Sequence, residues 1–165
     1  MQIVQQIGNV DLLKRDKVLF LCSKRTPLSL YDDVFRWTDS LSTEDCIACF
    51  NSTEMEAEVL KALLVARVPT VLYVMNRFTD VNNIQVERAL QERRLLIVVL
   101  RLDESRNKGL TPRLRNEYVL SQCKHVVCGY VNKNGSVFGL LAGRENVRRL
   151  IDEGRYAIAA EPEVR

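Results

Sequence analysis

The sequence is poor in histidine and lacks the common nucleotide-binding motifs. It contains one histidine, His125, and neither a G-x-G-x-x-G nor a G-x-x-x-x-G-K-[ST] motif, so the usual fingerprints of dinucleotide and nucleoside-triphosphate sites are missing. Its formal net charge is only +3, so any affinity for a polyanion has to come from a local patch. The longest apolar runs, such as residues 95–100, are far shorter than the roughly 20 residues of a membrane-spanning helix.

The five cysteines are odd in number and irregularly spaced, whereas secreted disulfide frameworks usually have an even number of cysteines in a shorter chain. The first 17 residues lack a basic segment followed by a long apolar one, so we expect no signal peptide. We therefore expect a soluble cytoplasmic protein with buried, reduced thiols and no membrane partner.

Cys46-x-x-Cys49 has the spacing of half a zinc site. On a strand, however, residues three apart point to opposite faces, so these two thiolates could not bind one ion. No second cysteine pair accompanies them, and Cys123 with His125 does not lie in a loop that suits a catalytic thiol. We therefore expect these residues to pack in the core, and we expect no metal and no cofactor.

The order of apolar segments predicts a single domain over the 165 residues. Strands are expected at 18–22, 45–50, 70–75, 95–100 and 126–131, and helices at 30–41, 53–67, 86–92 and about 112–123. Residues 1–16 form an N-terminal lead-in in this interpretation, and 154–165 a C-terminal tail. Strands that are apolar throughout and alternate with helices indicate an α/β fold of three layers, with a mostly parallel sheet and helices on both faces.

The segment after Asn132-Lys-Asn-Gly135 has two interpretations. Residues 136–141 can be the return strand of a hairpin, or the first turns of a helix that leads toward 146–153. Asn-Gly between apolar runs is a good hairpin signal, so the local pattern slightly favours the hairpin.

Ligands of parallel α/β sheets bind at the carboxyl ends of the strands, which places candidate loops at 23–28, 51–53, 75–80 and 132–136. In the first loop, Ser23, Lys24 and Arg25 could meet an anion, although a solvated turn explains them equally well. The second loop, Asn51-Ser52-Thr53, precedes a helix with Glu54, Glu56 and Glu58, and Thr53-x-x-Glu56 resembles a capping box. Such acids suit the helix dipole but repel phosphate, so this loop better suits a hydroxyl, an amine or a base edge.

The charge is unevenly distributed along the chain. Residues 1–83 have a balance of −2 and residues 84–165 a balance of +5, with eight basic residues against three acids between 88 and 115. A solvated helix face is the usual explanation of such a run, and a surface for nucleic-acid phosphates is the other. Aromatic residues are scarce there, which argues against base stacking.

The motifs resemble the DNA-processing protein A (DprA/Smf) family over most of residues 8–143. Gly8-Asn9 and the strand that runs into Ser23-Lys24-Arg25 are similar to that family's entry and its Gly-Ser-Arg loop, with Cys22 in place of the glycine. The segments 48–64 and 68–74 are similar to its second loop with helix and to its third strand, although three glutamates replace the glycine-rich second loop. Arg115-Asn116 and Gly135-Ser136 resemble its Arg-Asn pair and its Ser/Gly turn.

The resemblance implies a Rossmann-like fold, a helix after Gly135, and binding of a nucleotide or of single-stranded DNA without catalysis. In this hypothesis Ser23, Lys24 and Arg25 contact phosphate. Asn51, Ser52 and Glu54 lie at the sugar or base, Arg115 and Asn116 close the pocket, and Gly135 with Ser136 offers backbone donors. Two alternatives remain. The first is a phosphoribohydrolase-like enzyme, whose carboxylates would be Glu54 and Glu56, although the Pro-Gly-Gly-x-Gly-Thr signature of such enzymes is missing. The second is a homo-oligomeric scaffold with a degenerate pocket.

Overall fold

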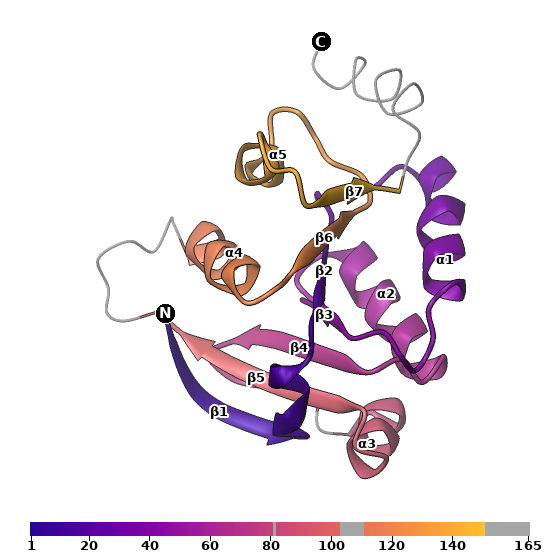
Figure 1. Ribbon diagram of the computed structural model, residues 1–165, viewed down its shortest axis with the longest axis vertical. Coiled ribbons are helices and arrows are strands. Elements are labelled where there is room, and N and C mark those ends of the chain that lie inside the picture. Colours follow the sequence, from indigo (N-terminus) through magenta and orange to yellow (C-terminus); the bar gives the residue numbers. More distant parts are fainter. Residues whose placement is uncertain (81, 103–110, 151–165) are drawn as a thin grey trace.

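The computed structural model describes residues 1–80, 82–102 and 111–150, and within them seven strands form one sheet in the order β1-β5-β4-β3-β2-β6-β7 (Figure 1). The strands are β1 (Gln2–Gly8), β2 (Val18–Leu21), β3 (Ile47–Cys49), β4 (Thr70–Met75), β5 (Leu95–Arg101), β6 (His125–Cys128) and β7 (Val147–Arg149). The α-helices are α1 (Tyr31–Asp39), α2 (Glu54–Val65), α3 (Ile84–Gln91), α4 (Thr111–Ser121) and α5 (Ser136–Leu141). Two short 3-10 helices, η1 (Val10–Lys14) and η2 (Leu28–Leu30), complete the described elements.

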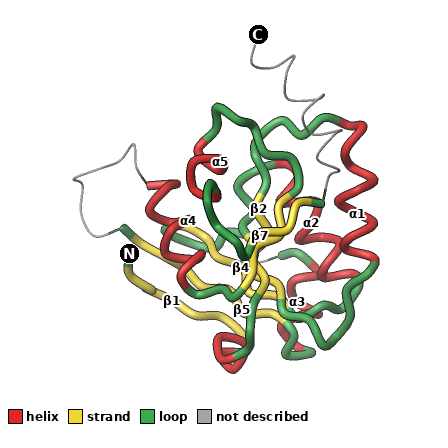
Figure 2. Tube along the Cα trace, turned by 45° about the horizontal axis from the view of Figure 1, so that its top comes forward, coloured by secondary structure: helices red, strands yellow, loops and turns green. Residues whose placement is uncertain are grey.

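Every strand pair is parallel except β1 with β5. The helices α1, α2 and α3 cover one face of the sheet, and α4 and α5 cover the other (Figures 1 and 2). The central strands are buried from both sides, and residues 95–100 are each at most 1% exposed. The predicted α/β fold with a mostly parallel sheet between two helical layers is confirmed. The sequence indicates it because strands that are covered on both sides have to be apolar on both faces.

The N-terminal residues add a strand that the sequence pattern does not predict. The polar residues Gln2, Gln5 and Gln6 break the apolar alternation, yet β1 pairs antiparallel with β5 at the edge of the sheet. An edge strand tolerates such residues, because its outer side faces solvent. Gly8 ends β1 with φ +109°, and a Cβ at this position would collide with the carbonyl oxygen of Leu95.

The local preference for a hairpin after Gly135 is wrong. Residues 136–141 form α5, and Val147–Arg149 forms β7 parallel to β6. Val137 and Leu141 are four residues apart and both buried, which is the spacing of one helical face. The helix provides the crossover that two parallel strands need. The helix α5 ends at Leu141, and Val147–Arg149 is a strand. The alternative of a helix that leads toward 146–153 is therefore not observed in the described part of that range. Residue 153 and the tail at 154–165 lie outside the described residues, as do positions 103–110 with Arg106 and Lys108.

The thiols lie where the sequence predicts them. Cys22, Cys46, Cys49 and Cys128 are buried, Cys123 is partly buried, and none of the five forms a disulfide. Burial raises the pKa of Cys22 and of Cys123 to about 12 in each case, so these side chains are neutral at physiological pH.

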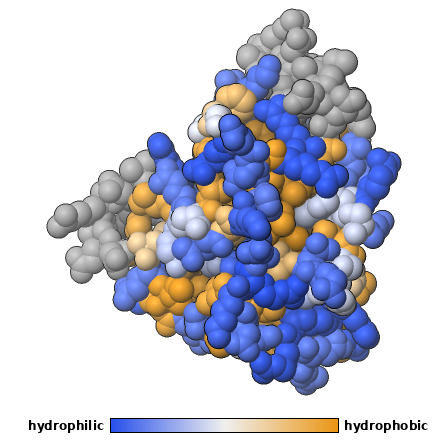
Figure 3. All heavy atoms as spheres, in the orientation of Figure 1, coloured by the Kyte–Doolittle hydropathy of each residue, from blue (hydrophilic) through white to orange (hydrophobic). Residues whose placement is uncertain are grey.

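The surface is largely polar on the face that Figure 3 draws. Hydrophilic residues cover much of the face in Figure 3, with hydrophobic residues visible between them. Large side chains such as Leu28 and Ile84 are exposed singly, which is normal for a folded domain. Among the described helices, none is both long enough and apolar enough to cross a bilayer.

Candidate functional site

The connectivity of the sheet brings three loops together at one edge. From β2 the chain winds through β3, β4 and β5, and it then returns to β6 on the other side of β2. The loops after β2 and β6 therefore leave in different directions and open a crevice at the carboxyl ends of the strands. A cavity of about 480 Å³ lies there, lined by Leu21, Cys22, Ser23, Lys24, Arg25, Ser52, Thr53, Glu56, Pro112, Arg115, Asn116, Asn132, Gly135, Ser136 and Val137.

Ser23 joins the loop after β2 to the loop after β6. Its backbone N–H donates to the Tyr130 carbonyl at 2.8 Å, and its Oγ accepts the backbone N–H of Asn132 at 3.0 Å. Next to it, Lys24 and Arg25 are exposed, and neither makes a hydrogen bond or ion pair with the part of the chain that the structure describes. Arg25 has φ +60°. A fixed serine is thus followed by two cations at the cavity that are available to an anion.

The turn between β3 and α2 is held by a capping box. Thr53 Oγ1 accepts the backbone N–H of Glu56 at 3.2 Å, and Glu56 Oε1 accepts the backbone N–H of Thr53 at 3.0 Å. The Ser52 hydroxyl also donates to Glu56 Oε1, at 2.9 Å. Glu56 is only 2% exposed. Burial raises the pKa of the Glu56 carboxyl, whereas the Ser52 hydrogen bond, the Arg115 charge and the Thr53 hydrogen bonds act to lower it.

Arg115 reaches the same turn from α4, on the other face of the sheet. Its Nη1 donates to Ser52 Oγ at 3.1 Å, and its Nε and Nη2 donate to Asn116 Oδ1 at 3.0 and 2.8 Å. The guanidinium lies 4.0 Å from the centre of the Phe50 ring, a distance at which the ring face attracts a cation. Burial lowers the pKa of Arg115, opposed by the Glu56 charge. The cation is therefore positioned before any ligand arrives.

The start of α5 forms the remaining wall. The Gly135 N–H donates to the Asn132 carbonyl at 2.9 Å, so this backbone donor is already used by the turn. A Cβ on Gly135 would lie 3.2 Å from that carbonyl oxygen and 3.7 Å from Ser23 Oγ. A side chain at this position would narrow the cavity beside Ser23.

Eight of the ten residues predicted for the site line this cavity: Ser23, Lys24, Arg25, Ser52, Arg115, Asn116, Gly135 and Ser136. Asn51 lies instead on a neighbouring cavity of about 260 Å³, where Ser52 and Arg115 form part of the wall that the two cavities share. Glu54 is exposed and lines neither of these two cavities.

Some lining residues were not predicted for the binding site. Cys22 and Asn132 follow directly from the paths of β2 and β6. Glu56 is predicted as an acid of the helix start and, in the hydrolase alternative, as a catalytic carboxylate, but not as a ligand-binding residue. The sequence did contain a signal for Glu56. The third residue of a capping box turns back toward the turn before its helix, and that turn lies at the carboxyl end of a strand.

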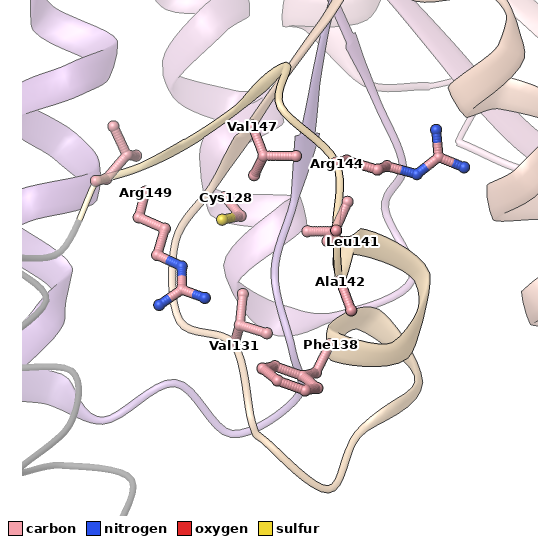
Figure 4. Close-up of a pocket in the computed structure, with 10 residues that line it drawn as sticks. Cys128, Val131, Phe138, Leu141, Ala142, Arg144, Val147 and Arg149 are labelled. Carbon is pink, nitrogen blue, oxygen red and sulfur yellow. The ribbon is translucent and has the colours of Figure 1, made fainter.

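A larger cavity of about 730 Å³ lies between α5 and β7 (Figure 4). Most of the residues that line it are apolar, and the Arg149 side chain runs along it toward Val131 while the Arg144 guanidinium points away. It contains no residue predicted for the site and no group of converging polar side chains.

A third, more open cavity of about 520 Å³ borders β6 and β7 beside His125. Within the described residues, no group of three or more His, Cys, Asp or Glu side chains could hold a metal ion.

Comparison with known proteins identifies the fold. No protein-family model and no curated protein sequence matches the chain. Among solved structures, DNA processing protein A (DprA) from Streptococcus pneumoniae is similar over 94% of this chain, with 17% identity and a TM-score of 0.64. DprA from Helicobacter pylori, described for its single-stranded DNA binding mode, is similar over 96% of this chain, with 12% identity and a TM-score of 0.60.

These likenesses show a DprA-like, Rossmann-like fold, as the motif resemblance implied. The chain spans 60% of the length of the S. pneumoniae structure and 86% of the H. pylori structure.

Proposed function

We propose that this domain binds the phosphate of single-stranded DNA or of a nucleotide in the 480 Å³ cavity, without catalysing a reaction. The observation that carries the proposal is the convergence of Lys24, Arg25 and Arg115 on one cavity at the carboxyl ends of parallel strands. Ligands of this class of sheet bind at that position. The DprA-like fold adds support, because one structural neighbour is described as binding single-stranded DNA.

The donors left at the cavity suit an anion. A guanidinium has five N–H donors, and Arg115 uses three of them on Asn116 and Ser52. Two donors therefore remain in a fixed plane, and a planar fork of this kind matches two phosphate oxygens. Lys24 and Arg25 add mobile charge from the opposite loop.

Fluorescence anisotropy with a labelled oligo-deoxythymidine, and competition by mononucleotides at low salt, tests the proposal. We expect Arg25→Ala and Arg115→Ala each to weaken binding by about 10-fold and to reduce the slope of log affinity against log salt by about 1. Arg113→Ala is the matched control, since Arg113 lies on the same helix but pairs with Glu117 at 3.0 Å. No binding of either ligand, or equal binding by all variants, would refute the proposal.

A second candidate function is hydrolysis of the bond between base and sugar in a nucleotide. Glu56 favours it, because a buried carboxyl whose pKa is raised beside an arginine in a cavity is typical of acid–base sites. In this reaction water adds to the sugar carbon while the base leaves with a proton. Incubation with nucleoside monophosphates, followed by chromatography, decides the matter: released base would establish the enzyme, and intact substrate would eliminate it.

A further inference from the structure

Glu56 has a carboxylate oxygen that the protein leaves unused. Its Oε1 accepts from both the Ser52 hydroxyl and the Thr53 N–H. Within residues 1–80, 82–102 and 111–150, no hydrogen bond reaches Oε2 and no cation lies within ion-pairing distance of the carboxylate. The residue is nevertheless 98% buried and lines the cavity. Oε2 is not among the fully enclosed polar atoms that lack a partner in the described part of the chain, so it is open to the cavity. Because burial of a charged carboxylate is costly, a ligand donor at Oε2 would add a favourable hydrogen bond.

The surroundings of Glu56 offer no substitute for that donor. Among the described residues, neither the Cys22 nor the Cys49 thiol donates a hydrogen bond to Glu56. Burial first and the Glu56 charge in addition raise their pKa values, so both thiols stay protonated and are at most weak donors. The Cys22 thiol is in contact with Thr26 Oγ1 at 3.1 Å. The charge of Arg115 attracts the Glu56 carboxylate, but hydrogen bonds link the two only through Ser52, whose hydroxyl donates to Oε1 and accepts from Nη1.

This arrangement places an acceptor and an anion site close together. Two hydrogen bonds, of 2.9 and 3.1 Å, link Glu56 Oε1 to Arg115 Nη1 through a single oxygen. A carboxylate only accepts hydrogen bonds, so it repels the phosphate itself and selects a donor beside it. In a nucleotide, the sugar hydroxyls are the donors within one ring of the phosphate, whereas base amines lie farther away.

We propose that Glu56 accepts a hydrogen bond from the 2′-hydroxyl of a ribose, so that the preferred ligand of this cavity is a ribonucleoside monophosphate. The inference rests on the proposed function, since the phosphate of the same ligand binds Lys24, Arg25 and Arg115. An internal nucleotide of DNA has no free sugar hydroxyl, and the 2′-hydroxyl is the group by which proteins distinguish ribose from deoxyribose. The cavity, at about 480 Å³, has the size of a small-molecule site.

Isothermal titration calorimetry with adenosine 5′-monophosphate and with its 2′-deoxy analogue tests the inference. For the unaltered protein we expect the ribonucleotide to bind about 10-fold to 100-fold more tightly, the effect of one hydrogen bond to a charged acceptor. Glu56→Gln should reduce this ratio by about 5-fold to 10-fold, because its Oε1 can keep both bonds of the turn while its amide group can make only a neutral hydrogen bond with the 2′-hydroxyl. Glu54→Gln is the matched control, since this exposed neighbour does not line the cavity and should leave the ratio unchanged.

The outcomes separate this inference from the proposed function. Equal affinity for the two nucleotides, or a preference that is undiminished in Glu56→Gln, would overturn the inference and leave phosphate binding intact. Binding of an oligodeoxynucleotide without binding of either nucleotide would have the same meaning. No binding of any of the three ligands would overturn both. Circular dichroism and thermal unfolding of Glu56→Gln establish that a lost preference does not reflect a lost fold.

Discussion

Replacement of Glu56 separates the structural work of its carboxyl group from its charge. The side chain closes the turn before α2, because its Oε1 accepts from Thr53 N and from the Ser52 hydroxyl. Glu56→Ala removes both bonds and leaves a buried void. Glu56→Gln keeps an oxygen for the same two donors and removes only the charge.

The two variants should therefore differ strongly in stability. Loss of a helix cap and of the second hydrogen bond predicts that Glu56→Ala lowers the free energy of unfolding by about 2–4 kcal/mol. For a chain of this size, roughly 2–4 °C of melting temperature corresponds to each kcal/mol, so the shift is about 4–16 °C. Glu56→Gln should stay within about 1 kcal/mol of the unaltered protein, because removing a buried charge offsets the loss of its attraction to Arg115.

Thermal and urea unfolding at neutral pH, followed by circular dichroism, provide the measurement. Glu58→Ala serves as the control, since Glu58 lies on the exposed side of the same helix and should change the free energy of unfolding by less than about 0.5 kcal/mol. Equal destabilisation by Ala and Gln at position 56 would mean that charge, not hydrogen bonding, holds the turn. An unaltered melting temperature in Glu56→Ala would mean that the cap contributes nothing.

Three further predictions concern the rest of the molecule. Burial raises the pKa of Glu56 above its ordinary value of 4.5. The protein should therefore gain stability relative to Glu56→Gln as pH falls through the raised pKa, and the gain should be complete below 4.5. A difference in the free energy of unfolding between the two proteins that stays constant from pH 4 to pH 8 in urea titrations would contradict this. Gly8→Ala should lower the free energy of unfolding by at least about 2 kcal/mol, because φ is positive and the new methyl meets the Leu95 carbonyl, whereas Gly139→Ala has open space and should be neutral or stabilising. Cys123 is the one thiol of the five that is only partly buried, and burial still raises its pKa to about 12. All five thiols should therefore react with a disulfide reagent far more slowly in the native protein than in urea. Rapid reaction of one or more thiols in the native protein would refute their burial.

The sequence predicts best those features that depend on neighbouring residues. The strand at Thr70–Met75 has the predicted bounds, and the capping box of Thr53 and Glu56 forms as its spacing requires. The gathering of the predicted loops also follows from a local pattern. Once the strands are known to be parallel, their carboxyl ends must lie at one edge of the sheet, and eight predicted residues do line one cavity there.

The features that could not be predicted depend on partners far away in the chain. The strand β1 has three glutamines among its seven residues and pairs with β5, 88 to 99 residues later in the chain. Similarly, an Asn-Gly turn favours a hairpin only if the following residues can reach the preceding strand. The edge of β6 is taken instead by β7, which arrives in parallel after α5. Long-range pairing of this kind overrides local turn chemistry.

The distribution of charge over the fold also differs from its distribution along the chain. The basic excess between 88 and 115 suggests a surface for phosphates, but Arg93, Arg94 and Arg113 each form an ion pair with a carboxylate. Among the described basic residues of that segment, Arg115 alone lines the 480 Å³ cavity, and the other two cations of its wall, Lys24-Arg25, come from the half of the chain with a net charge of −2. Because an ion pair already satisfies most of a side chain's charge, a count over a segment overstates the cations available to a ligand. Affinity for phosphate in this domain should therefore follow three side chains brought together by the crossing of the sheet, and not the basic segment as a whole.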